Sequence, residues 1–274
     1  MLGYQIIQAA SAKLPNSQSP EADARQLLGF TMGVPFSQVP LSDFPDSQLR
    51  EFWELVEQRA TGIPVQHLTG EAAFRHLVLT VGPGVFIPRP ETELIVELGL
   101  PKLAGQDSPL VVDLCTGSGA VAASFATETA ARVYAVELDP VAFDYAKTNL
   151  TGTGAELVLD DFRTALPELN SQVDLVVSNP PYVPEAVRSE LPADVLRDPE
   201  LALFGGDDGL SWIPALIETA ARLLKPGGWF IFEHDDTHGE SAPALLAANE
   251  HFYCVSEHLD YASRPRFAMA RKVA

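Results

Sequence analysis

Apolar residues recur at helical spacing in three segments of the first sixty residues, and proline-rich stretches separate these segments. The segments run over about 4–14, 20–33 and 46–62, and Ser19-Pro20-Glu21 gives the second a typical helix start. Each predicted helix has one apolar face, which it can bury only against the other two. We therefore predict a small helical bundle over residues 1–72.

The pattern changes after residue 62. Two short extended runs, at about 76–81 and 85–87, flank Gly82-Pro83-Gly84. Glycine and proline between two extended runs are typical of a hairpin turn. We therefore predict a β-hairpin linker over residues 73–88, followed by an apolar helix that opens at Pro88-Arg89-Pro90-Glu91-Thr92-Glu93.

Beyond residue 108, strand patterns alternate with helix patterns. The predicted strands are 110–114, 132–137, 156–159, 174–178, 229–233, 252–258 and 266–272, and the predicted helices are 120–127, 140–150, 209–224 and 242–249. Such alternation indicates an α/β fold with a mostly parallel sheet between two helical layers. We predict a Rossmann-like, seven-stranded domain over residues 89–274, with one of the last two strands antiparallel.

The charge of the chain narrows the choice of partners. With 18 Lys and Arg against 37 Asp and Glu, the net charge is −19 over 274 residues. Binding to nucleic acid rests mainly on basic side chains that pair with phosphates, so this balance disfavours a duplex substrate. A basic protein partner or a small molecule is compatible with it, and we expect a monomer without direct contact to nucleic acid.

The cysteines and the N-terminal sequence argue against several other classes of protein. The two cysteines, Cys115 and Cys254, form no CxxC pair, which excludes a disulfide framework and a structural zinc site. His234 and His238 resemble a metal pair, but a polar loop after the fifth strand is the simpler interpretation, and we predict no metal. The chain shows no signal peptide and no apolar run of about 20 residues, so we expect a cytoplasmic enzyme with no membrane association.

A glycine-rich loop, Cys115-Thr116-Gly117-Ser118-Gly119, joins the strand at 110–114 to the next helix. Glycine lets the backbone approach a ligand closely. A dinucleotide would fit such a loop, but Ala122 stands where the third glycine of that motif is expected. Asp113 at the strand end suits a cationic amino-acid ligand better than a pyrophosphate, which favours S-adenosylmethionine.

Acidic residues end the next two strands. Glu137 lies about 20 residues beyond the loop, where a carboxylate can bind ribose hydroxyls. Asp161 after the third strand is placed to accept from an adenine amine, and Phe162 to cover the ring. Each carboxylate alone is equally consistent with a solvated strand end, but three successive strand ends favour a cofactor site.

The segment Asn179-Pro180-Pro181-Tyr182 leaves the fourth strand at the edge where ligands bind in open α/β sheets. The side-chain oxygen of Asn179 and the carbonyl of Pro180 can accept both hydrogens of a planar NH2 group, which places its nitrogen for methyl transfer. The prolines stiffen the segment, and Tyr182 can lie against the planar group. By itself the segment is also typical of a turn, but its place after the glycine-rich loop favours alkylation of an amide or amine nitrogen.

Four segments resemble the bacterial release factor glutamine methyltransferases. They are Pro64-Val65-Gln66-His67-Leu68-Thr69-Gly70, Phe86-Ile87-Pro88-Arg89-Pro90-Glu91-Thr92-Glu93, Asp113-Leu114-Cys115-Thr116-Gly117-Ser118-Gly119 and Asn179-Pro180-Pro181-Tyr182. The resemblance implies a class I methyltransferase domain and transfer of a methyl group to N5 of the glutamine in the Gly-Gly-Gln tripeptide of peptide chain release factors. It also implies that the helical N-terminal domain helps to dock that protein.

The same resemblance assigns site residues. It implies that Cys115 to Gly119, Glu137, Phe162 and Asn179 contact S-adenosylmethionine, while Asn179, Pro180, Pro181 and Tyr182 contact the glutamine. Three residues depart from the family pattern. Such enzymes usually carry glycine in place of Cys115. Many carry aspartate in place of Glu137, and some carry tryptophan in place of Phe162.

Three alternatives remain open at this point. A ribosomal-protein glutamine methyltransferase could have an almost identical site. An adenine-N6 nucleic-acid methyltransferase uses the same segment, although the charge of −19 counts against it. A non-catalytic scaffold that binds S-adenosylmethionine is disfavoured by the intact Asn-Pro-Pro-Tyr segment.

Overall fold

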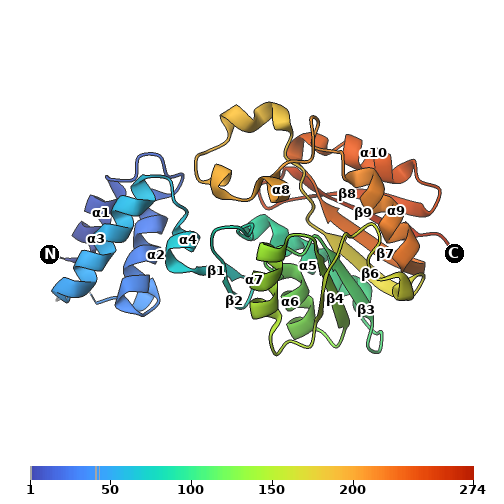
Figure 1. Cartoon of the computed structure of the whole chain (residues 1–274), viewed down its shortest axis with the longest axis horizontal. Coiled ribbons are helices and arrows are strands. Elements are labelled where there is room, and N and C mark those ends of the chain that lie inside the picture. The colour runs from blue at the N-terminus through green and yellow to red at the C-terminus, as the bar shows by residue number, and fades with distance from the viewer. Residues whose placement is uncertain (1, 41, 43) are drawn as a thin grey trace. The chain divides into compact units, whose positions relative to one another are not determined.

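The computed structural model describes residues 2–40, 42 and 44–274. The chain divides into two compact units (Figure 1). The first reaches to Glu71 and includes Pro192–Arg197, and the second comprises Ala72–Leu191 and Asp198–Ala274. No helix in the described part of the chain is both long and apolar enough to cross a membrane.

The first unit is helical, as its apolar pattern predicts. It contains α1 (Gly3–Ser11), α2 (Pro20–Met32), α3 (Asp46–Ala60) and α4 (Val65–Thr69), with short 3₁₀ turns η1 (Phe36–Gln38) and η5 (Val195–Arg197). The apolar faces of these helices meet in one core, which includes Ile6, Leu14, Leu27, Leu28, Phe52 and Val56.

A buried arginine ties the inserted segment to this unit. Arg59 is 7% exposed, and its Nε lies 2.7 Å from Oδ2 of Asp23 on α2. Its Nη2 lies 3.1 Å from Oδ2 of Asp194, in the segment that the chain contributes after its Asn-Pro-Pro-Tyr motif. A buried guanidinium needs such partners, because removing one would leave a charge unpaired.

The second unit is built on one seven-stranded sheet, as predicted. The strands are β3 (Leu110–Leu114), β4 (Arg132–Glu137), β5 (Glu156–Leu159), β6 (Val173–Ser178), β7 (Leu224–Glu233), β8 (Phe252–Leu259) and β9 (Pro265–Lys272). Their order is β5-β4-β3-β6-β7-β9-β8. β3 to β7 are parallel, and β9 is antiparallel to both of its neighbours.

Helices cover both faces of this sheet (Figure 1). α5 (Glu93–Leu103), α6 (Ala120–Glu128) and α7 (Pro140–Leu150) pack on one face, and α9 (Ile213–Leu223) and α10 (Ser241–Ala247) on the other. The strand order reverses beside β3, which pairs with both β4 and β6. In open α/β sheets ligands bind at the carboxyl ends of the strands beside such a reversal, so a site is expected here.

The hairpin differs from its prediction. β1 (Glu71–Phe74) and β2 (Leu77–Thr80) pair across a turn at Arg75 and His76, so Gly82-Pro83-Gly84 lies beyond the hairpin. Arg75 takes a positive φ of 52°. Its backbone N donates to Glu93 at 2.8 Å, and its guanidinium donates to both oxygens of Glu128 at 2.6 and 2.8 Å. These long-range ion pairs stabilise a turn without glycine or proline, which local turn rules miss.

The chain beyond β6 is also more structured than its sequence suggests. It contains the 3₁₀ turn η4 (Glu185–Glu190) and the short helix α8 (Glu200–Leu203) before α9. Further 3₁₀ turns are η2 (Pro90–Thr92), η3 (Pro167–Leu169) and η6 (Asp236–His238). The predicted helix at 209–224 begins only at Ile213, and β7 begins at Leu224, five residues before the predicted strand.

Candidate active site

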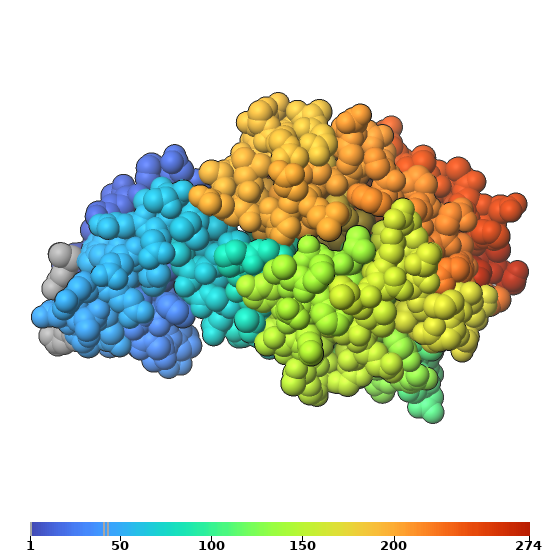
Figure 2. All heavy atoms as spheres, in the orientation of Figure 1, coloured from blue at the N-terminus to red at the C-terminus, as the bar shows by residue number. Residues whose placement is uncertain are grey.

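A pocket opens at the carboxyl ends of β3, β4 and β6, within the second unit. Figure 2 shows the surface hollowed between the orange atoms of the segment that includes α8 and the lime-green atoms of α7. Every predicted site residue except Gly119 lines this pocket: Cys115, Thr116, Gly117, Ser118, Glu137, Asp161, Phe162, Asn179, Pro180, Pro181 and Tyr182. The fold thus brings together residues that are up to 67 positions apart, from Cys115 to Tyr182.

The glycine-rich loop is held by Asp113 at the end of β3. Oδ2 of Asp113 accepts from the Thr116 hydroxyl at 2.5 Å and from the Ala122 backbone N at 3.1 Å. Asp113 is 1% exposed, and burial raises its pKa to about 7, against the opposing effect of these hydrogen bonds. Asp113 therefore fixes the shape of the loop, in addition to lining the pocket.

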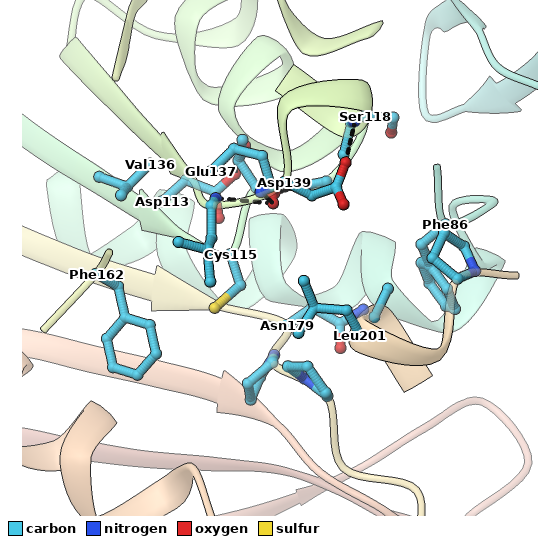
Figure 3. A pocket seen from close by; sticks show the side chains of 18 of the residues that line it. Phe86, Asp113, Cys115, Ser118, Val136, Glu137, Asp139, Phe162, Asn179 and Leu201 are labelled. Carbon is cyan, nitrogen blue, oxygen red and sulfur yellow. Dashed lines mark hydrogen bonds between the residues drawn. The ribbon is translucent and has the colours of Figure 1, made fainter. Parts of the chain in front are cut away.

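Cys115, Gly117 and Gly119 all have a positive φ in this loop. Cys115 has a φ of 60°, in the left-handed region that favours glycine. Its sulfur points into the space between Phe162 and Asn179 (Figure 3), and burial raises the pKa of the thiol. Gly119, with a φ of 82°, instead precedes α6, where a Cβ would press on Leu150 and Ala146 of α7. Its role is close packing behind the pocket.

Glu137 links the loop to the end of β4. Its Oε2 accepts from the Gly117 backbone N at 2.7 Å, and its Oε1 accepts from the Leu138 and Asp139 backbone N atoms, both at 2.9 Å. Burial raises the pKa of Glu137, and the backbone hydrogen bonds oppose that rise. Asp139 also caps α7, accepting from the N atoms of Val141 and Ala142 at 2.7 and 3.1 Å.

Asp161 and Phe162 follow β5 on the same side of the pocket. Asp161 forms an ion pair with Arg163, whose Nη2 lies 2.5 Å from its Oδ2, and the hydrogen bond to Arg163 holds the pKa of Asp161 below its usual range. The side chain of Phe162 flanks the cavity opposite Asn179 and Leu201 (Figure 3).

The Asn-Pro-Pro-Tyr segment is anchored from several elements. The Ser178 hydroxyl donates to the Leu114 carbonyl at 2.7 Å, which joins the ends of β6 and β3. Asn179 Nδ2 donates to Thr92 Oγ1 at 3.2 Å, and the Tyr182 hydroxyl donates to Glu233 Oε1 at 2.6 Å. Burial and the nearby Glu233 raise the pKa of Tyr182 well above its usual value, so its phenol stays protonated.

Two glycines let the chain pass close behind this segment. A Cβ on Gly205 would lie 2.7 Å from the Pro181 carbonyl oxygen, and a Cβ on Gly209, whose φ is 78°, would collide with the Tyr182 carbonyl oxygen. The Val183 backbone also pairs with Leu203 and Gly205, through N–O distances of 2.8 and 3.0 Å. The backbone after β6 is therefore fixed by tight packing.

Sequence reasoning assigned no role to several residues of this region. Phe86, Pro88 and Thr92 line the pocket, and they belong to the segment at 86–93 that carries the family resemblance. Asp198, which is buried, accepts from the Ile87 backbone N at 3.3 Å and pairs with Arg89 at 2.6 Å. Glu233 ends β7, so the strand-end rule that singled out Glu137 would have found it as well.

The charge of the lining bears on the ligand. Asp113, Glu137, Asp139, Asp160 and Asp161 line the pocket, and Arg163 among its lining residues is already paired with Asp161. A pyrophosphate would meet carboxylates there, whereas a cationic ligand with hydroxyl groups would be attracted. The residues therefore fit S-adenosylmethionine better than a dinucleotide. Among the residues that the structure describes, no group of three or more His, Cys, Asp or Glu side chains could hold a metal ion.

Comparisons with known proteins agree with the two-part organisation and the fold of the chain. A family described as PrmC N-terminal domain matches residues 5–70, and one described as Methyltransferase domain matches residues 111–197. A solved structure of a methyltransferase from Pyrococcus furiosus has a TM-score of 0.51 and 17% identity, over 72% of this chain and 89% of that chain. This likeness shows a shared fold, and with the domain match it confirms the predicted fold class.

Two curated relatives bear on the acceptor. The chain is 44% identical over 203 residues to the 4-amino-L-phenylalanine/4-methylamino-L-phenylalanine methyltransferase of Streptomyces pristinaespiralis, covering 72% of this chain and 70% of that protein. It is 45% identical over 262 residues to the release factor glutamine methyltransferase of Streptomyces coelicolor, covering 93% of this chain and 92% of that protein. As the resemblance of its motifs predicted, the chain belongs to the family of release factor glutamine methyltransferases.

Proposed function

We propose that this protein transfers a methyl group from S-adenosylmethionine to the side-chain amide nitrogen N5 of the glutamine in the Gly-Gly-Gln motif of peptide chain release factors. Membership of the family makes the chain an S-adenosylmethionine-dependent methyltransferase. The observation that carries the proposal is that the glycine-rich loop and the Asn-Pro-Pro-Tyr segment line one pocket. A donor and an amide acceptor can therefore meet there.

S-adenosylmethionine, when bound, supplies a methyl group on a positively charged sulfur. The lone pair of an amide nitrogen is delocalised, so the acceptor must be held in line with that carbon. Asn179 Oδ1 and the Pro180 carbonyl accept the two hydrogens of the NH2 group, and Tyr182 lies against its plane. A nitrogen held in this way would take the methyl group as the bond from carbon to sulfur breaks, and would then lose one amide proton to water.

The remaining site residues have roles on the cofactor side. Cys115, Thr116, Gly117 and Ser118 would face the amino-acid part of S-adenosylmethionine, and Gly119 would shape the loop from behind. Glu137 would bind the ribose hydroxyls, because its Oε2 has lone-pair capacity beyond the Gly117 bond. Phe162 would cover the adenine. Asp161 would accept from the adenine amine with an oxygen that also faces Arg163.

The organisation of the chain suits a protein substrate. The helical unit matches the PrmC N-terminal domain over residues 5–70, and we assign to it the docking of the release factor. We propose that the enzyme is a monomer, works in the cytoplasm where release factors act, and makes no direct contact with nucleic acid. The net charge of −19 supports the last point.

One assay tests the proposal against its rivals. The purified chain and methyl-labelled S-adenosylmethionine are mixed with a release factor, a release factor whose Gly-Gly-Gln glutamine is alanine, a ribosomal protein, DNA, and 4-amino-L-phenylalanine. We expect label on the intact release factor alone. The last acceptor is included because the relative from Streptomyces pristinaespiralis is named for it. Label that persists on the alanine variant, or that goes mainly to another acceptor, would exclude the proposed substrate.

A further inference from the structure

A chain of hydrogen bonds behind the pocket joins Asn179 to a buried carboxylate. Asn179 Nδ2 donates to Thr92 Oγ1 at 3.2 Å, and the Thr92 hydroxyl donates to Glu233 Oε2 at 2.7 Å. The second oxygen of Glu233 accepts from the Tyr182 hydroxyl at 2.6 Å. Thr92 and Glu233 are 4% and 1% exposed, so these bonds are shielded from solvent.

The partners of Glu233 set the direction of this chain. Burial raises the pKa of Glu233, while the hydrogen bonds from Tyr182 and Thr92 oppose that rise by favouring the carboxylate. With Oε1 accepting from Tyr182 and Oε2 from Thr92, the Thr92 hydroxyl gives its single proton to Glu233. The oxygen of Thr92 is then left to accept, and the neighbouring atom of Asn179 must be its NH2 group. The oxygen of the Asn179 carboxamide consequently turns the other way, toward the pocket that Asn179 lines.

The opposite orientation would place NH2 against the NH2 of an acceptor. Two donors facing each other form no hydrogen bond, and both would lose their water on binding. A carboxamide that rotates freely would spend part of its time in that state. Fixing the rotation before the acceptor arrives lowers the ordering cost of the reactive complex.

We propose that Thr92 and Glu233 are positioning residues, which orient the Asn179 carboxamide so that its oxygen receives the acceptor NH2; this rests on the proposed function. Glu233 contacts both acceptor-binding side chains, because it also accepts from the hydroxyl of Tyr182. The hydrogen-bonded series Asn179–Thr92–Glu233, called the relay below, explains why a carboxylate is buried at the end of β7 without lining the pocket. An Asn179 carboxamide oriented in this way favours an acceptor group that donates hydrogen bonds, whether that group is an amide or an amine.

The test compares substitutions that keep or remove the Thr92 hydroxyl. Thr92→Val has nearly the same shape but cannot relay the bond, whereas Thr92→Ser keeps the hydroxyl. We expect Thr92→Val to lower kcat for release factor methylation by about 10- to 100-fold, with the Kd for S-adenosylmethionine changed less than about threefold. Thr92→Ser should recover most of the rate. Thr219→Val, the same change at a buried threonine of α9, controls for the loss of a buried hydroxyl.

A second variant tests the carboxylate. Glu233→Gln introduces an NH2 group that can donate to Thr92 and so reverse the chain, which should lower kcat by about tenfold. Combined with Thr92→Val, the loss should fall short of the product of the two single losses, because both changes break the bonds that lead to Asn179, while only Glu233→Gln alters the bond to Tyr182. A full, multiplicative loss in the double variant would contradict a shared role.

An NMR measurement separates this inference from the identity of the substrate. In the free protein, one side-chain NH proton of Asn179, assigned through Asn179→Asp, should exchange slowly in the wild type and in Thr92→Ser, and quickly in Thr92→Val. If the wild type does not methylate release factors but shows this protection, the proposed function fails and the relay stands. Equal exchange in all three proteins, or an unchanged kcat in an active Thr92→Val enzyme, overturns the relay.

Discussion

The cofactor side of the pocket is held by hydrogen bonds between groups close in the sequence, whereas the acceptor side is held by bonds between distant segments. Asp113 and Thr116 are three residues apart, and Gly117 and Glu137 are twenty apart. On the acceptor side, Asn179 reaches Thr92 across 87 residues, and Tyr182 reaches Glu233 across 51. The bonds that hold the glycine-rich loop therefore need only β3 and β4 to be paired, whereas those on the acceptor side also need the chain at Thr92 and the end of β7 to be in place.

This difference predicts separable losses. Changes on the acceptor side should reduce methyl transfer while the cofactor still binds. Changes on the cofactor side should appear in stability or in the affinity for S-adenosylmethionine. A substitution on one side that lowered both methyl transfer and the affinity for S-adenosylmethionine would show that the two sides act as one structure.

The largest effect is expected for Asn179→Ala. Losing the oxygen that receives the acceptor should lower kcat by about 100- to 1000-fold, the range seen when one positioned hydrogen-bonding group is removed from an active site. The Kd for S-adenosylmethionine, measured by calorimetry, should change by less than about tenfold. Nearly intact turnover would show that Asn179 does not position the acceptor, and a cofactor affinity lost in parallel would remove the division between the two sides.

The same difference decided what the sequence could predict. The glycine-rich loop, Glu137 and the Asn-Pro-Pro-Tyr segment each lie at the end of a strand with a clear apolar pattern, so strand-end rules found them. Glu233 also ends a strand, but its role, like that of Thr92, becomes clear only when Asn179 and Tyr182 are placed against these residues. Arg75 gives the corresponding lesson for the fold, because the ion pair with Glu128 that stabilises its turn spans 53 residues.

The second prediction concerns pH and Asp113. Its pKa rises from 3.8 to about 7 on folding, chiefly through burial, so the native state holds a proton that the unfolded state releases. The native state is favoured below pH 3.8, and this contribution is lost as the pH rises toward 7. A pKa rise of that size corresponds to a change of at most about 4 kcal/mol in the free energy of unfolding between pH 3.8 and about pH 7.

Asp113→Asn should remove this contribution, because an amide carries no ionisable proton. The free energy of unfolding, measured in urea at pH 5 and pH 8, should fall less between these values in the variant than in the wild type. Other carboxylates affect both proteins alike, so the difference between the two slopes isolates Asp113. Parallel pH dependences would show that Asp113 ionises normally in the folded protein.

The third prediction tests the packing behind the acceptor side. Gly209→Ala places a Cβ against the Tyr182 carbonyl oxygen and should cost about 1–3 kcal/mol of stability, as overpacking does. Moving Tyr182 should also lower kcat by about tenfold. Gly105→Ala is the matched control, because Gly105 has a similar φ of 76° but no atom within 4 Å of the new Cβ. Equal losses in the two variants would assign the effect to backbone strain alone.

The smallest effect is expected for Arg163→Ala on the cofactor side. Arg163 pairs with Asp161 at the exposed edge of the pocket, with 54% of its side chain exposed. Exposed ion pairs contribute little because solvent screens them, so the Kd for S-adenosylmethionine should change by less than about fivefold. The sign is informative: removing Arg163 frees the Asp161 carboxylate, and if that oxygen accepts from the adenine amine, binding should tighten slightly. Asp161→Asn should then weaken binding in the Arg163→Ala background. A weakening of more than tenfold in Arg163→Ala alone would mean that the guanidinium itself contacts the cofactor, and that the cofactor side also depends on a side chain at the surface.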